Sequence, residues 1–274
     1  MAKIGLIAGN GRFPFLVADQ IKKNGEQAVI IALNEETDRK IDEAGHKVFW
    51  VPLGQLQKMI EIFRGEGVSI AIMAGQVKHA QLFAKLKLDW RAVKLLGRIV
   101  NKKTDTILGA VCDEFQKEGI KLLPSHQYLL HLLPKKGLIC GEKPGKYEKD
   151  DIEFGLRIAN QIAGMDIGQT VVVKDKAVVA VESIEGTDEC IKRAAKYAGD
   201  GVVVVKVAKP NQDFRFDIPV IGPRTVETLA ANKVRLMAVE AESTLMIDRE
   251  ELVRKANEMK VTIIAVENKN EVKK

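Results

Sequence analysis

The amino-acid sequence predicts an α/β protein with two α/β domains, an N-terminal Rossmann-like open sheet and a C-terminal mixed-sheet domain. In the first half, short apolar runs alternate with helical patterns, and residues 3–33 read as strand, glycine turn, helix and strand. In the second half, β-branched runs flank Asp175-Lys176 as in a hairpin. Between the halves, Pro134–Asp151 has the glycine, proline and lysine content of a linker. We therefore expect domains at 1–135 and 136–274.

Apolar periodicity predicts the individual elements. In the first half we expect strands at Lys3–Ala8, Ala28–Leu33, Lys47–Val51 and Val68–Ala74, and helices ending at Lys23, over Leu53–Arg64 and over 104–118. In the second half we expect helices at Ile152–Ile162, ending at Ala198 and over 223–232, and strands at Thr170–Lys174, Ala177–Glu182, Val202–Val205, Leu236–Ala241, Thr244–Ile247 and Val261–Val266. Thr104-Asp-Thr106 is expected to cap its helix, and Asp248 with Glu251 to form a capping box.

Composition narrows the classes of function. The net charge of +6 fits an anionic ligand or a membrane surface but is too small for a typical nucleic-acid binder, so no nucleic-acid partner is expected. The three cysteines form no CxxC pattern, and the four histidines have no ligand spacing. The sequence starts directly in a strand and has no apolar stretch near the roughly 20 residues that span a bilayer. We expect a soluble, cytoplasmic protein.

Two glycine-bearing turns follow predicted parallel strands, at Gly9-Asn10-Gly11 and at Gly75-Gln76 with Lys78 close behind. Parallel strands bring such turns to one sheet edge, where α/β proteins bind nucleotides. Asp105 either caps its helix or faces these turns. A nicotinamide-dependent oxidoreductase is an alternative, with Glu35 as the ribose-binding acid, although Pro14 stands where the dinucleotide fingerprint has glycine. A tight turn without a ligand is the structural alternative.

The loop over 206–222 carries Lys206, Lys209, Asp213, Arg215 and Asp217 at the exit of a buried strand. Two carboxylates and three cations suit a metal-assisted phosphate site, in which carboxylates hold Mg²⁺ and cations neutralise phosphate oxygens. Glu182 and Glu185 also follow a strand, and they converge with the cations if the two strands are neighbours. A solvated loop with chance charges is the alternative.

The stretch Leu82–Lys103 alternates apolar residues at helical spacing with seven basic residues and a single acid, Asp89. A basic amphipathic helix can bind an anionic membrane surface. It can equally pack on its own domain and turn its basic face to solvent. A non-catalytic lipid or anionic-surface binding protein is therefore a further alternative function.

Several motifs together resemble the LpxI family of UDP-2,3-diacylglucosamine pyrophosphatases of lipid A biosynthesis. They are Ile7-Ala-Gly-Asn-Gly-Arg-Phe-Pro14, Met73-Ala-Gly-Gln-Val-Lys78, Asp105 at a helix start, Asp166-Ile-Gly-Gln-Thr-Val-Val-Val173, Ala180-Val-Glu-Ser-Ile-Glu-Gly-Thr-Asp188 and Lys209-Pro-Asn-Gln-Asp-Phe-Arg-Phe-Asp-Ile-Pro-Val-Ile-Gly222. The resemblance runs along nearly the whole chain. Its departures include Asn10, where the family often has glycine, and Arg12-Phe13.

The resemblance implies hydrolysis of the pyrophosphate of UDP-2,3-diacylglucosamine to UMP and 2,3-diacylglucosamine 1-phosphate (lipid X). It implies UDP on the first domain, the acylated glucosamine phosphate on the second, Mg²⁺ or another divalent cation such as Mn²⁺, and a homodimer. Because such a substrate has acyl chains, we expect peripheral contact with the cytoplasmic face of the inner membrane, through the stretch Leu82–Lys103. The expected catalytic residues are Asp217, Asp213, Arg215 and Lys209, the metal ligands Asp217, Asp213, Glu182 and Glu185, and the nucleotide-binding residues Gly9, Asn10, Gly11, Gln76, Lys78 and Asp105.

Overall fold

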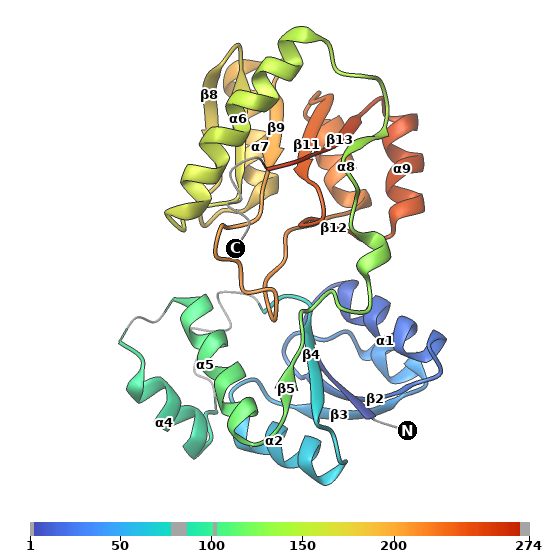
Figure 1. The fold of residues 1–274 in the computed structure, drawn as a ribbon, viewed down its shortest axis with the longest axis vertical. Helices are drawn as coiled ribbons and strands as arrows, with labels where there is room; N and C mark the ends of the chain where they lie inside the picture. Colours follow the sequence, from blue (N-terminus) through green and yellow to red (C-terminus); the bar gives the residue numbers. More distant parts are fainter. Residues whose placement is uncertain (1–2, 78–86, 101–102, 269–274) are drawn as a thin grey trace. The chain divides into compact units, whose positions relative to one another are not determined.

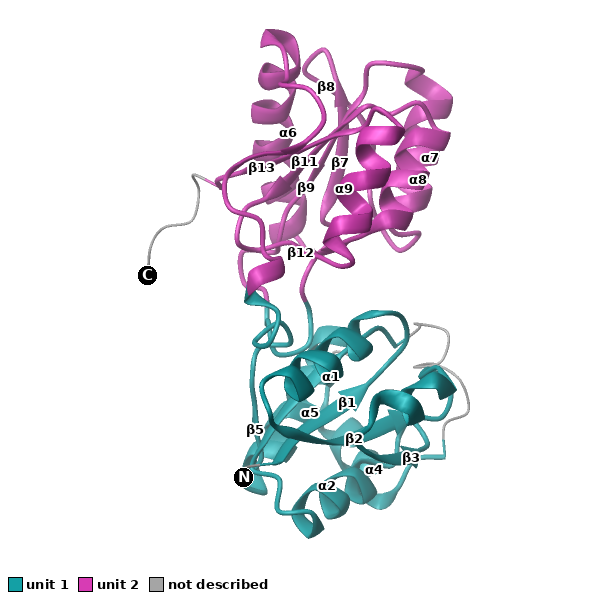
Figure 2. Ribbon diagram, turned by 90° about the vertical axis from the view of Figure 1, so that its right-hand side faces the viewer, with its two compact units in different colours: residues 1–130, 213–217 teal, residues 131–212, 218–274 magenta. Residues whose placement is uncertain are grey.

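The computed structural model describes residues 3–77, 87–100 and 103–268. They form two compact units (Figure 1, Figure 2): unit 1 contains Met1–Leu130 and Asp213–Asp217, and unit 2 contains His131–Gln212 and Ile218–Lys274. The chain therefore passes from one unit to the other three times, at residues 130–131, 212–213 and 217–218. Among the described residues no helix is both long and apolar enough to cross a membrane.

Unit 1 is built on a five-stranded sheet in the order β3-β2-β1-β4-β5, and every pair in it is parallel. This order and orientation confirm the predicted Rossmann-like open sheet. The strands are β1 (Lys3–Ala8), β2 (Gln27–Leu33), β3 (Lys47–Val51), β4 (Ile70–Ala74) and β5 (Lys121–Leu122). The order reverses between β1 and β4, so the loops after these two strands meet at the point where such sheets bind ligands.

Helices cover both faces of the unit 1 sheet. They are α1 (Phe13–Lys23), α2 (Leu56–Gly65), α4 (Trp90–Arg98), α5 (Thr104–Lys117) and the short 3₁₀ helix η1 (Arg39–Ala44). The core that α2, α4 and α5 form with the sheet contains Phe63 and Phe115, both fully buried. The first helix starts with proline in its first turn, where the missing N–H has no helical partner to lose.

Unit 2 is built on a six-stranded mixed sheet in the order β6-β13-β11-β9-β7-β8. The central strands β9, β11 and β13 are parallel, and β6, β7 and β8 pair antiparallel with their neighbours. Their bounds are β6 (Gly137–Cys140), β7 (Thr170–Lys174), β8 (Ala177–Val181), β9 (Val203–Lys206), β11 (Leu236–Glu240) and β13 (Thr262–Val266). Strands β10 (Val220–Ile221) and β12 (Leu245–Met246) form a separate parallel pair. The predicted mixed sheet is confirmed.

Successive side chains of each strand in unit 2 point to opposite faces of the sheet, and each face packs against a different set of helices. Val172, Val204 and Met237 face one core with α7 (Thr187–Ala198), α8 (Pro223–Ala231) and α9 (Arg249–Glu258). The alternate residues Val171, Val173, Val203 and Val205 face the other core with α6 (Lys146–Gly164). Figure 2 shows α6 on one side of the sheet and α7, α8 and α9 on the other. Both faces are buried, which explains the nearly continuous apolar runs of these strands.

Three local predictions need correction. The stretch expected to be a linker, Pro134–Asp151, contributes the edge strand β6 and the first turns of α6, because its apolar residues pair with β13. Thr104 is the first helical residue of α5 and not its cap, since Lys103 occupies the cap position without a side-chain hydrogen bond. Asp248 precedes α9 but makes no side-chain cap hydrogen bond, because its backbone is left-handed (φ 46°).

Candidate active site

In unit 1, the loops that follow β1 and β4 are joined by hydrogen bonds. The N–H of Gly9 donates to the carbonyl of Ala74 (2.8 Å), Asn10 N–H donates to Gln76 O (2.7 Å), and Gln76 N–H donates back to Asn10 O (3.0 Å). A Cβ on Gly9 would lie 2.6 Å from Gln76 O, and a Cβ on Gly75 would lie 2.7 Å from Asn10 O. Both glycines are therefore needed for the close approach of the two loops.

This pairing changes how the turn can bind a nucleotide. The backbone N–H groups of Gly9 and Asn10 are already used, so these residues can contact a ligand through the Asn10 side chain but not as a phosphate-binding N–H cradle. Gly11 has φ +93°, and an added Cβ would meet no neighbour there, so its turn is open to an approaching group. Lys78 lies outside the described residues.

Two other residues predicted for this edge have defined positions. Glu35, the acid considered for a ribose contact, accepts a hydrogen bond from the N–H of Leu53 (2.9 Å) and so holds the chain between β3 and α2. Asp105 lies in the first turn of α5, where a negative charge is favourable to the helix dipole. The geometry of Glu35 gives no support to the oxidoreductase alternative.

The loop with the predicted catalytic residues forms a tight turn. The carbonyl of Asp213 accepts from the N–H groups of Phe216 (3.2 Å) and Asp217 (3.1 Å). The carboxylate of Asp213 accepts from the backbone N–H of Arg215 (3.1 Å) and from its guanidinium, with Nε–Oδ1 at 2.9 Å and Nη2–Oδ2 at 2.6 Å. This two-pronged pairing lowers the pKa of Asp213 and raises that of Arg215. Asp213 and Arg215 thus fix the turn that carries Asp217.

This turn packs on unit 1, although we expected the whole loop to belong to the C-terminal domain. The N–H of Ser125 donates to Phe214 O (2.6 Å), and the ring of His126 meets the Phe214 ring edge-on at 5.3 Å. The Phe216 side chain packs against the core that contains Phe63 and Phe115. The contacts with unit 1 are made by Phe214 and Phe216. The prediction missed them, because a single aromatic residue in a charged loop belongs to no periodic pattern that would show which domain it packs on.

In unit 2, polar residues gather where β9 ends. Lys206 is 9% exposed, and its Nζ donates to Thr187 Oγ1 (3.0 Å) at the first position of α7. The Thr187 hydroxyl in turn donates to Glu182 Oε1 (2.9 Å). Thr170, fully buried on β7, lies 3.4 Å from the same hydroxyl. We expected acids and cations to converge if β8 and β9 were neighbours. They are separated by β7, and Thr187 connects them instead.

The remaining predicted residues of unit 2 have ion-pair partners. Lys209 Nζ lies 2.8 Å from Asp166 Oδ1, and Glu185 accepts from the guanidinium of Arg193 at 2.5 Å. A hydrogen bond from its own backbone N–H, and then the hydrogen bond from Arg193, lower the pKa of Glu185. Glu185 therefore lies in a surface ion pair, and Lys209 stabilises the turn that begins at Asp166.

A divalent metal can be tested against these side chains. Within residues 3–77, 87–100 and 103–268, no group of three or more histidine, cysteine, aspartate and glutamate side chains is arranged to hold a metal. Of the four predicted ligands, Asp213 is occupied by Arg215 and Glu185 by Arg193. Mg²⁺ commonly uses only one or two carboxylates together with waters and substrate phosphates. The described side chains therefore do not enclose a metal, and a cation bound by one or two of these carboxylates would need waters or ligand oxygens to complete its coordination.

Burial excludes two of the thiols as nucleophiles. It raises the pKa of Cys112 to about 12 and that of Cys190 to about 12, and both side chains are fully buried. At neutral pH they are protonated and inaccessible. A covalent mechanism through either cysteine is therefore not favoured.

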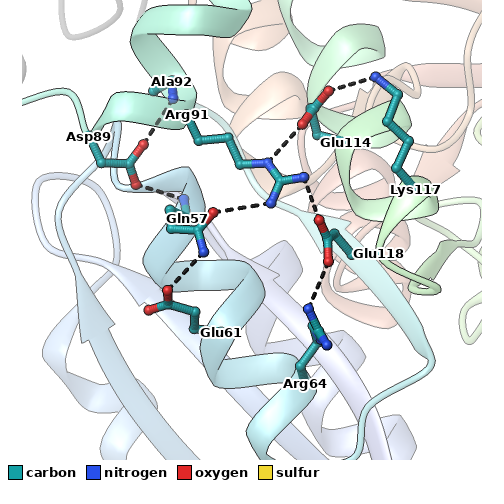
Figure 3. A network of polar contacts seen from close by, with 9 residues as sticks. All are labelled: Gln57, Glu61, Arg64, Asp89, Arg91, Ala92, Glu114, Lys117 and Glu118. Atoms are coloured by element: carbon teal, nitrogen blue, oxygen red, sulfur yellow. Dashed lines mark hydrogen bonds and ion pairs between the residues drawn. The ribbon is translucent and has the colours of Figure 1, made fainter.

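In its described part, the predicted membrane helix is shorter than expected. Here α4 covers Trp90–Arg98, and the carboxylate of Asp89 caps it by accepting a hydrogen bond from the Ala92 N–H (2.9 Å). Residues 82–86 and 101–102 lie outside the described residues. Arg91 is not part of an outer basic face: its side chain is 12% exposed and binds Glu114, Glu118 and Gln57 (Figure 3). The outer face is instead Trp90, Val93, Lys94, Gly97 and Arg98, all exposed.

The fold and these sites define a class: a two-unit α/β protein with polar residues at the carboxyl ends of parallel strands in each sheet and an acidic turn anchored on the first unit. The chain belongs to the LpxI family, whose N-terminal domain model matches residues 3–132 and whose C-terminal domain model matches residues 135–264. It is 30% identical over 279 residues to "UDP-2,3-diacylglucosamine pyrophosphatase LpxI" of Caulobacter vibrioides, covering 97% of this chain and 98% of the relative. The protein is accordingly a hydrolase.

Proposed function

We propose that the protein hydrolyses the pyrophosphate bond of UDP-2,3-diacylglucosamine, with UMP and 2,3-diacylglucosamine 1-phosphate (lipid X) as products. The observation that carries the proposal is the full-length similarity to the Caulobacter vibrioides pyrophosphatase, which spans both units and the acidic turn. In this reaction a water oxygen bonds to one phosphorus and the bridging P–O bond breaks, so that the bridging oxygen stays on the other phosphate. The two protons of the water pass to the product phosphates or to solvent, and UMP and lipid X leave as phosphate monoesters.

Asp217 is the residue to which we assign the central role. A pyrophosphate resists hydrolysis because its anionic oxygens repel a nucleophile, so the site must position water and offset charge. The Asp213–Arg215 ion pair and the packing of Phe216 against the core of unit 1 fix the backbone of the turn. The positions open to the Asp217 carboxylate are therefore restricted. A carboxylate fixed in this way can orient a water molecule or hold a cation next to the diphosphate.

We further propose that the reaction needs Mg²⁺, or another divalent cation such as Mn²⁺, with Asp217 as its protein ligand. A bound cation would neutralise phosphate oxygens and stabilise the leaving phosphate. Addition of EDTA should abolish UMP release, and excess Mg²⁺ or Mn²⁺ should restore it. Full activity after exhaustive chelation would remove the metal from the proposal.

The test of the assignment is Asp217→Ala, with Asp217→Asn as the near-isosteric variant. We expect both variants to lose UMP release by about 10³-fold or more, because the charged carboxylate is missing from the reacting centre. Far-UV circular dichroism should stay unchanged. Asp19→Ala, which removes an exposed carboxylate on α1, is the matched control and should retain normal turnover. Near-normal turnover of Asp217→Asn would contradict the role of Asp217.

We also propose that the enzyme works as a homodimer on the cytoplasmic face of the inner membrane, which it contacts through α4. The acyl chains of the proposed substrate are held in a bilayer. On the exposed face of α4, Trp90 and Val93 are 62% and 55% exposed, next to the cations Lys94 and Arg98. Apolar and basic side chains on one face suit an anionic lipid surface.

A further inference from the structure

A groove of about 180 Å³ lies on unit 1 between α4 and α5, which pack against each other. Residues three or four apart in sequence lie on one side of a helix, and both walls of the groove follow this spacing. The wall from α4 includes Trp90, Lys94 and Arg98, and the wall from α5 is Ala110, Asp113, Glu114 and Lys117. The groove exists because the two helices pack together, so spacing along either helix alone could not predict it.

The two carboxylates of the groove already have cationic partners. Glu114 binds Arg91 (2.7 Å) and Lys117 (2.6 Å), as Figure 3 shows. Asp113 Oδ1 lies 3.9 Å from Nη1 of Arg215, which belongs to the acidic turn. Both acids are therefore directed to cations other than those on the outer face of α4.

The other two cations of the groove, Lys94 and Arg98, carry charge that the described residues do not neutralise. Both side chains are exposed, and within residues 3–77, 87–100 and 103–268 neither forms an ion pair or a side-chain hydrogen bond. They are four residues apart on α4, so both can reach one anionic group. Two neighbouring donors with positive charge suit the two unesterified oxygens of a phosphodiester.

The side chains and the size of the groove indicate the source of this phosphodiester. Trp90 lines the groove, and Val93 is exposed on the same outer face of α4. A free phosphate ion would gain nothing from an exposed tryptophan and valine, whereas the glycerol and acyl part of a lipid would bury them. A volume of about 180 Å³ is below the roughly 300 Å³ at which pockets for drug-sized ligands begin, so it suits a head group and not a nucleotide.

We propose that the groove between α4 and α5 binds the head group of an anionic glycerophospholipid such as phosphatidylglycerol. Lys94 and Arg98 bind the phosphodiester oxygens, and Trp90 lies at the boundary between the head group and the acyl chains. The inference rests on the proposed membrane contact of α4, and it adds a site for a single lipid molecule to that contact. A basic surface alone attracts any anionic bilayer but holds no single lipid.

The direct test offers the full chain dihexanoyl-phosphatidylglycerol below its critical micelle concentration, so that single lipid molecules and no bilayer are present. Calorimetry should show binding, and dihexanoyl-phosphatidylcholine, which has no net charge, should bind much more weakly. The double variant Lys94→Gln, Arg98→Gln should weaken binding by about tenfold or more, because two charge-assisted hydrogen bonds are lost. Lys58→Gln is the matched control, because Lys58 is an exposed cation on α2 and does not line the groove.

A second variant tests the groove without changing its charge. Ala110→Leu places a larger side chain in the groove and should abolish binding of the single lipid, while binding to phosphatidylglycerol vesicles largely remains. An unchanged melting temperature checks that the fold is intact, and the double glutamine variant changes only exposed side chains if Ala110→Leu does not fold. Wild-type affinity in either folded variant would overturn the site, and equal affinity for inorganic phosphate would overturn the assignment to a lipid.

Vesicle binding separates this inference from the proposed membrane contact. If phosphatidylglycerol vesicles bind but the single lipid does not, the contact stands and the groove is overturned. If the single lipid binds through Lys94 and Arg98 but vesicles do not, the membrane contact is wrong and the groove is kept. Neither assay involves hydrolysis, so a wild type that releases no UMP would overturn the proposed activity alone.

Discussion

At the scale of single residues, the Asp213–Arg215 pair decides the conformation of the acidic turn. Both carboxylate oxygens of Asp213 accept from the guanidinium, and one also accepts from the Arg215 backbone N–H. Because both of its oxygens are bound by Arg215, the Asp213 carboxylate stabilises the turn and is a poor metal ligand. We therefore assign the catalytic role to the other carboxylate of this turn, Asp217.

The lowered pKa of Asp213 makes a prediction about acid stability. A carboxyl group whose pKa is lower in the folded state stabilises the fold above its unfolded pKa, and this stabilisation is lost as pH falls through the folded value. Asp213→Asn should therefore lower the free energy of unfolding at pH 7, and its difference from the wild type should shrink as pH falls below about 4. Urea unfolding at several pH values measures this. A difference that is constant from pH 7 to pH 3 would contradict the role of the pair.

At the scale of elements, Arg91 joins three helices of unit 1 (Figure 3). It extends from α4 and binds Gln57 of α2 and the carboxylates Glu114 and Glu118, of which the first is on α5 and the second directly follows it. The hydrogen bonds from Lys117 and Arg91 lower the pKa of Glu114, and the hydrogen bond from Arg91 lowers that of Glu118. From the amphipathic pattern we expected Arg91 on the outer, basic face of its helix. It lies on the inner face, because its two acidic partners, Glu114 and Glu118, come from α5 and the residue that follows it.

Arg91→Met should destabilise unit 1 by about 1–3 kcal/mol, since two partly buried carboxylates lose a shared partner while Lys117 and Arg64 still neutralise them in part. Arg64→Met is the matched control, because Arg64 is 63% exposed and solvent screens its ion pair, so this variant should change the free energy of unfolding much less. Urea unfolding followed by tryptophan fluorescence measures both variants. Equal effects of the two would show that Arg91 has no special role.

The outer face of α4 gives a membrane prediction at the same scale. The chain has two tryptophans, Trp50 and Trp90, so Trp50→Phe leaves Trp90 as the only fluorophore of this kind. Vesicles that contain phosphatidylglycerol should shift Trp90 emission to shorter wavelength, and high salt should reduce the effect. Replacement of Lys94 and Arg98 by glutamine should weaken it. An unchanged spectrum with anionic vesicles would mean that α4 makes no membrane contact.

At the scale of the whole molecule, residues 213–217 belong by sequence to the second family domain and by packing to unit 1. Unit 1 is therefore completed by a segment that follows most of unit 2 in the chain. This explains why the turn is anchored by the Phe216 side chain and by the backbone of Ser125, both of which lie in unit 1. The turn to which we assign chemistry is therefore positioned by the unit on which we expect the nucleotide.

This topology predicts that a substitution late in the sequence destabilises the first unit. Phe216→Ala should lower the free energy of unfolding of unit 1 by about 1–3 kcal/mol, less than for a fully buried phenylalanine because this side chain is half-buried. Both tryptophans lie in unit 1, so their fluorescence reports its unfolding selectively. The variant should also lose kcat, and Phe216→Leu should recover much of both. A fluorescence transition at the wild-type urea concentration would contradict the anchoring.

The sequence by itself determined the two α/β units, most of the described strands (β5, β6 and β10 were not predicted) and the polar residues at strand ends. These features can be read from short stretches of sequence. Strands buried on both faces are continuous apolar runs, and the turns that follow them are marked by glycine and charged residues. Only the tertiary structure showed that Asp213 is occupied by Arg215, that Thr187 connects Lys206 to Glu182, that Arg91 faces inward and that the acidic turn packs on unit 1. Each of these contacts depends on which distant segments lie side by side, and residue spacing along one strand or helix carries no information about that.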